Sequence, residues 1–82
     1  MEKLPDILET DGNKYPLSSY KSEEDDGFFG WWCFQYVGHN GMPIEAHDGN
    51  SWYYLTAFEP TYEEAYADLL KRITNMKGVK HC

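Results

Sequence analysis

Two segments, residues 30–37 (GWWCFQYV) and 51–58 (SWYYLTAF), carry large apolar side chains at both sets of alternating positions. The alternating sets are Trp32, Phe34 and Tyr36 against Trp31, Cys33 and Val37, then Trp52, Tyr54 and Phe58 against Tyr53, Leu55 and Ala57. An antiparallel strand with one solvated face normally alternates apolar with polar residues. Both segments are therefore predicted to be strands whose sheet has apolar surface to cover on each face.

A different period begins after residue 60. Thr61 and Glu64 form a Ser/Thr-x-x-Glu capping box, and Gly78 suits the left-handed position that ends many helices. Spacings of three and four predict one apolar helix face, made of Ala65, Leu69, Ile73 and Met76 with Tyr62 and Tyr66. We expect a helix over about 61–77.

Asn-Gly and Asp-Gly pairs recur at residues 11–13, 26–27, 40–41 and 48–50, with strand-like segments between them. Such pairs supply the positive φ angles of tight hairpin turns. The prediction is an α+β fold, in which an antiparallel meander of three to five strands carries one C-terminal helix on one face. Residues 42–47 (MPIEAH) are an optional short strand. We expect a single domain over 1–82, with the sheet at about 4–58 and a short tail at 78–82.

One helix covers one face of a small sheet, so the other face needs a different cover. We assign the smaller residues Leu55, Ala57, Cys33 and Val37 to the helix side. The outer face then carries a patch larger than monomers usually leave idle, made of Trp32, Phe34, Tyr36, Trp52 and Tyr54. The alternative is that the loop segments at 21–27 and 39–50 fold over these rings.

The chain has a formal charge of −7, and residues 31–60 contain neither Lys nor Arg. Such a balance disfavours direct binding to nucleic acid or membranes and favours a basic protein partner. Four acids, Glu23, Glu24, Asp25 and Asp26, directly precede the first aromatic segment. They either protect an aggregation-prone strand or form the rim of a protein-binding surface.

No apolar run is long enough to span a membrane or act as a signal peptide, which predicts a cytoplasmic protein. Cys33 and Cys82 do not form a disulfide framework, and His39, His47 and His81 stand in no metal-binding or catalytic motif. We therefore expect no catalytic residues, no metal and no cofactor.

The passage from SWYYLTAF into PTYEEAYADLLKRI resembles the strand-to-helix passage of HicB-type antitoxins and of small uncharacterised phage or prophage proteins. The common element is a Thr-x-Glu-Glu-Ala helix start, and no functional residues are carried over. In size, charge and aromatic content the chain is also similar to small acidic phage-encoded inhibitors, including anti-CRISPR proteins. That likeness implies a nucleic-acid mimic, with the acids at 23–26, joined by Glu9 and Asp11, standing in for phosphates.

The leading hypothesis is a small, acidic, non-catalytic protein-binding module, centred on the aromatic face and rimmed by the acidic loop. An acidic mimic that inhibits a nucleic-acid or host-defence enzyme is the first alternative. A structural homodimer through the aromatic face is the second.

Overall fold

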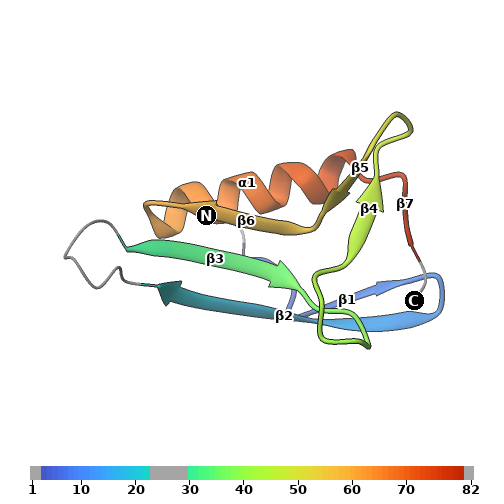
Figure 1. Cartoon of the computed structure of the whole chain (residues 1–82), viewed down its shortest axis with the longest axis horizontal. Coiled ribbons are helices and arrows are strands. Elements are labelled where there is room, and N and C mark those ends of the chain that lie inside the picture. Colours follow the sequence, from blue (N-terminus) through green and yellow to red (C-terminus); the bar gives the residue numbers. More distant parts are fainter. Residues whose placement is uncertain (1–2, 23–29, 81–82) are drawn as a thin grey trace.

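The computed structural model describes residues 3–22 and 30–80, and within them it has an α+β fold, as predicted. A four-stranded antiparallel sheet, a smaller three-stranded sheet and one helix make up the molecule (Figure 1). In chain order the elements are β1 (Ile7–Thr10), β2 (Asn13–Ser22), β3 (Trp31–Tyr36), β4 (Glu45–His47), β5 (Trp52–Tyr54), β6 (Thr56–Glu59), α1 (Tyr62–Asn75) and β7 (Gly78–Val79).

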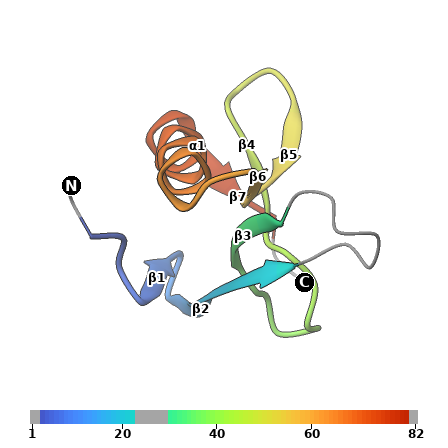
Figure 2. The same ribbon diagram turned by 90° about the vertical axis from the view of Figure 1, so that its left-hand side faces the viewer.

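The larger sheet has the order β1-β2-β3-β6, with every neighbouring pair antiparallel. Its first turn is built from Asp11 and Gly12, which have φ angles of 52° and 79°. Both values lie in the left-handed region that a tight hairpin turn requires. The sheet is curved, and α1 lies on the inner side of the curve (Figure 2).

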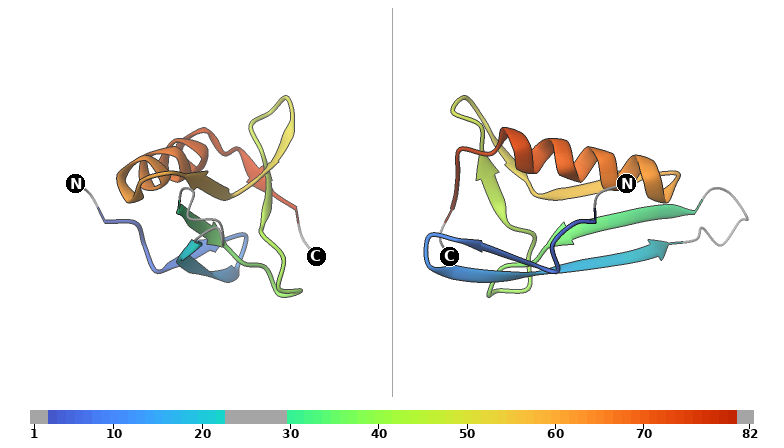
Figure 3. Two further views of the ribbon diagram at one scale, coloured as in Figure 1. Left: turned by 60° about the vertical axis from the view of Figure 1, so that its left-hand side comes forward. Right: turned by 180° about the vertical axis from the view of Figure 1, so that it is seen from behind.

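The smaller sheet has the order β5-β4-β7 and lies at the end of the molecule away from the paired residues Ser22 and Trp31 (Figure 3). Three backbone hydrogen bonds join the two sheets. Tyr36 N–H donates to the Leu55 carbonyl oxygen at 3.1 Å, Leu55 N–H to that of Ile44 at 2.8 Å, and Ile44 N–H to that of Tyr36 at 2.9 Å. Residues 52–59 therefore run as one extended segment that pairs with β4 in its first half and with β3 in its second.

The helix begins as its capping box predicts, because Glu64 N–H donates to Thr61 Oγ1 at 3.2 Å. It ends at Asn75, two residues before the predicted end. Gly78 does not occupy the left-handed position after the helix, which corrects our prediction. It lies in β7, opposite His47 of β4, where a Cβ atom would come within 2.7 Å of His47 Nε2. A Cβ atom here would force the His47 imidazole to move, and that ring also packs against Trp52.

The core lies between α1 and the inner side of the sheets, where Tyr36, Leu55 and Leu69 are fully buried. The Tyr36 hydroxyl donates to the Pro5 carbonyl oxygen at 2.8 Å, so it holds the N-terminal segment against the core. Burial, with a smaller effect of Asp6, raises the pKa of Tyr36 to about 12.

Candidate protein-binding face

The predicted assignment of sheet faces is wrong for β3. Phe34 is 3% exposed and Tyr36 is fully buried, both on the helix side. Tyr62 of α1 packs edge-on against Phe34 and Trp32, with ring centroids 5.0 and 5.1 Å apart. Phe34 and Tyr36 are therefore core residues and offer no surface to a partner.

The strand register explains the error. Phe34 lies directly opposite Ala57 of β6, so a large residue and a small one share the helix side. Cross-strand partners point to the same face, and a shift of one residue exchanges the faces completely. Our assignment grouped small residues with small ones, whereas the helix packs on alternating large and small side chains.

The outer side of the sheet also carries large aromatic residues. Cys33 of β3 pairs with Tyr20 of β2 on one side and with Phe58 of β6 on the other, so the three residues share a face. Trp31 lies two residues before Cys33 in β3 and is on the same face. Tyr20 is 47% exposed, Trp31 38% and Phe58 52%. Sequence reasoning did not include these three residues in the site.

The same surface continues along β5. Trp52 and Tyr54 alternate with the inner residues Tyr53 and Leu55, so they share a side with Phe58, and they are 53% and 49% exposed. These two members of the predicted site do lie on the outer side. We call the whole set the outer aromatic face, comprising Tyr20, Trp31, Trp52, Tyr54 and Phe58.

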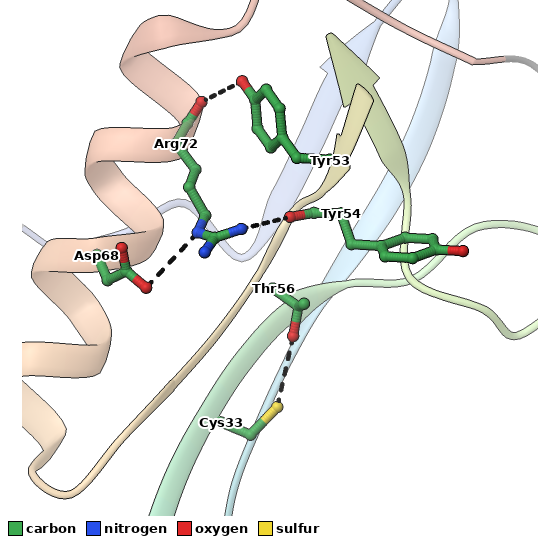
Figure 4. Close-up of polar contacts among 6 residues, drawn as sticks. All are labelled: Cys33, Tyr53, Tyr54, Thr56, Asp68 and Arg72. Carbon is green, nitrogen blue, oxygen red and sulfur yellow. Dashed lines mark hydrogen bonds and ion pairs between the residues drawn. The ribbon is translucent and has the colours of Figure 1, made fainter. Parts of the chain in front are cut away.

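Contacts with α1 hold β5 in the orientation that turns Tyr54 outward. The Tyr53 hydroxyl donates to the Arg72 carbonyl oxygen at 2.8 Å, and Arg72 Nη1 donates to the Tyr54 carbonyl oxygen at 3.2 Å. Asp68 lies 3.5 Å from Arg72 Nε and steadies the guanidinium. Figure 4 shows the Tyr54 ring pointing away from the helix while its backbone faces Arg72.

Cys33 lies in the middle of the outer side, yet it is fully buried. Its Sγ is 3.7 Å from Thr56 Oγ1 (Figure 4). The same Sγ is 4.0 Å from Gln35 Oε1. The Cys33 thiol raises the pKa of Tyr20, mainly through a hydrogen bond between the two side chains. Polar groups therefore lie between the aromatic rings, and the outer surface combines apolar area with hydrogen-bonding capacity.

Trp52 is supported from β4. The ring of His47 packs against it, with centroids 4.9 Å apart and planes at 63°. Beside them lies a shallow hollow of about 140 Å³, lined by His47, Trp52 and residues 49–51. A second hollow of about 230 Å³ lies between Tyr53 and the last turns of α1. Neither hollow encloses a small molecule as a binding cleft would.

The predicted acidic rim, Glu23, Glu24, Asp25 and Asp26, lies outside the described residues. Of the fourteen acids, nine are in the described part, together with all seven bases, so this part has a formal charge of −2. On the outer side, Glu45 lies opposite Tyr54, and its carboxylate is 3.5 Å from Lys80 Nζ. Most of the formal charge of −7 therefore belongs to residues outside the described part of the chain.

No protein-family model, curated protein or solved structure matches the chain. Residues 3–22 and 30–80 contain no group of three or more His, Cys, Asp or Glu side chains placed to hold a metal ion. In that same part of the chain, α1 is too short and too polar to cross a membrane.

Proposed function

We propose that the protein is a non-catalytic protein-binding module and that the outer aromatic face is its binding surface. The observation that carries the proposal is the clustering of Tyr20, Trp31, Trp52, Tyr54 and Phe58, each between 38% and 53% exposed, on one side of an 82-residue chain.

The amount of aromatic surface supports this proposal. A buried aromatic side chain removes roughly 150–250 Å² from water, so these exposures leave about 500 Å² open. Exposed apolar surface of this amount on a small protein often binds a partner. Tyr and Trp suit such a surface because each combines a large apolar ring with a polar group.

The surroundings of the rings also suit a protein partner. Ser18, Ser22, Gln35 and Thr56 lie between or beside them on the same side of the sheet. Interfaces combine an apolar centre, depleted in charge, with polar groups that can form hydrogen bonds. The acids at 23–26 remain part of the proposal as the segment that would steer a basic partner.

Affinity capture tests the proposal. A tagged copy is mixed with a bacterial lysate containing the untagged chain, at low and at moderate salt, and the retained proteins are identified. We expect Phe58→Ala to abolish specific retention and Met42→Ala to preserve it, because Met42 is equally open, at 55% against 52%, but lies in the turn after β3. Equal retention by the wild type and Phe58→Ala would contradict the proposal.

The salt series separates two kinds of partner. Binding of a basic protein by the acids at 23–26 weakens as salt screens the charges, and weakens again when the four acids become amides. Binding through the aromatic rings alone is nearly independent of salt.

A further inference from the structure

We infer that the occupant of the outer aromatic face is a second copy of the same chain, packed sheet against sheet with its strands antiparallel to the first. This inference rests on the proposed function and names the partner.

The size of the outer surface favours a second copy. The open aromatic surface is about 500 Å², and the polar residues around it extend the same side of the sheet toward the roughly 800 Å² per partner of a standard interface. A two-fold dimer uses the same surface on both copies, so this face needs no second surface to complement it. Two sheets stacked about 10 Å apart would then bury the rings between two outer helices.

The charge of the surface also favours a second copy. Between Tyr20, Trp31 and Phe58 the described residues on the outer side are uncharged, and beside Tyr54 the Glu45 carboxylate is paired with Lys80 Nζ at 3.5 Å. The centre of a dimer interface is depleted in charge in the same way.

The acids at one end of the sheet set the orientation of the copies. Glu59, Glu63 and Glu64 lie where β6 ends and α1 begins, at the same end of the sheet as Trp31, because Glu59 is opposite Trp32. Parallel stacking would bring two acid-rich ends together, while antiparallel stacking separates them.

Antiparallel stacking also predicts which residues meet. Trp52, Tyr54, Thr56 and Phe58 follow one another on the outer side of the extended segment. A two-fold axis near Thr56 places Tyr54 of one copy opposite Phe58 of the other. The dimer then has two such contacts, each between the Tyr54 ring of one copy and the Phe58 ring of the other.

Sedimentation equilibrium between about 100 µM and about 1 µM measures the dissociation constant of the wild type and its variants. We expect the wild type to be dimeric, with unchanged or tighter association at higher salt. Phe58→Ala should weaken the dimer on the order of 1,000-fold, because truncating a central aromatic costs about 30-fold and occurs in both copies. Met42→Ala should leave it unchanged.

Mixing two charged variants tests the orientation. Phe58→Asp and Tyr54→Lys should each be monomeric alone and should form a dimer when mixed, because antiparallel stacking brings the two new charges together. Circular dichroism establishes that each variant is folded. A monomeric wild type at all concentrations would overturn the inference, and a mixture that stays monomeric would overturn the antiparallel arrangement. If the wild type is monomeric and captures a lysate protein that Phe58→Ala does not retain, the proposed function stands and only the second-copy inference fails.

Discussion

Replacement of Tyr36 by Phe should make the protein less stable than the wild type at neutral pH and more stable at alkaline pH. At neutral pH the variant loses one buried hydrogen bond, from the Tyr36 hydroxyl to the Pro5 carbonyl oxygen at 2.8 Å. Such a bond contributes about 1 kcal/mol to the free energy of unfolding. We therefore expect Tyr36→Phe to be less stable than the wild type by about 1 kcal/mol at pH 7.

The balance changes at alkaline pH. Burial raises the pKa of Tyr36 to about 12 in the folded protein, against about 10 in the unfolded chain. Between these values the unfolded chain releases the proton while the folded protein retains it. The contribution of the protonated Tyr36 hydroxyl to the free energy of unfolding is complete below about pH 10 and is lost as the pH rises through 12. At pH 12 the loss is about 2 kcal/mol.

The variant has no hydroxyl to ionise at position 36, so it lacks this loss, whereas the other tyrosines affect both proteins alike. The two unfolding free energies should therefore be equal near pH 11, and the variant should be the more stable protein by about 1 kcal/mol at pH 12. Urea unfolding followed by circular dichroism at a series of pH values measures the difference. Tyr54→Phe is the matched control at neutral pH, because its ring is 49% exposed and its stability should change by less than about 0.5 kcal/mol. A constant difference in unfolding free energy between wild type and Tyr36→Phe from pH 7 to 12 would contradict this prediction.

Three further substitutions test the local structure by urea unfolding. Gly78→Ala should lower the free energy of unfolding by about 1–3 kcal/mol through the contact with His47, and adding His47→Ala should recover part of that loss. Thr61→Ala removes the acceptor that caps α1 and should cost about 1 kcal/mol. Backbone N–H groups of Ser51 and Asn50 lower the pKa of Asp48, so its contribution is present above pH 3.8 and is lost as the pH falls through the lowered pKa. Asp48→Asn should lack this acid-dependent loss, which a pH series between 2 and 5 would reveal.

The helix was predictable because its signals are local. The capping box at Thr61 and Glu64 and the apolar spacing around Leu69 lie within one segment, and the structure has both the cap and the buried face. Its end was not predictable from Gly78. That glycine is explained by a long-range contact with His47, and such a contact leaves no local signal in the sequence.

The sheet faces were only half predictable. Alternation along residues 52–58 correctly grouped Trp52, Tyr54 and Phe58, and the same alternation could have added Phe58 to the predicted site. Alternation within one strand shows which of its own residues share a face. It does not show which residues of the neighbouring strand lie on that same face of the sheet. The pairing of Phe34 with Ala57 decides this, and that register depends on the tertiary fold.

The division of the segment at 51–58 between two sheets was also missed. The backbone of Leu55 bonds to both Tyr36 and Ile44, and this branching of the pairing has no counterpart in composition or periodicity. Tyr20 was missed for a related reason. It lies in a polar strand, and only its pairing with Cys33 brings it to the outer aromatic face.

We propose that one face of the sheet is core and the other is an open binding surface, and a matched pair of phenylalanines tests this division. Phe34 is 3% exposed and Phe58 is 52% exposed, so the same truncation can be compared on the two faces. The measurement is the free energy of unfolding of Phe34→Ala and Phe58→Ala at a protein concentration where association is absent.

We expect a loss of about 3–5 kcal/mol for Phe34→Ala and less than about 1 kcal/mol for Phe58→Ala. Equal losses for the two variants would contradict this expectation, because Phe58 would then be covered by its own chain and would have no surface to offer a partner.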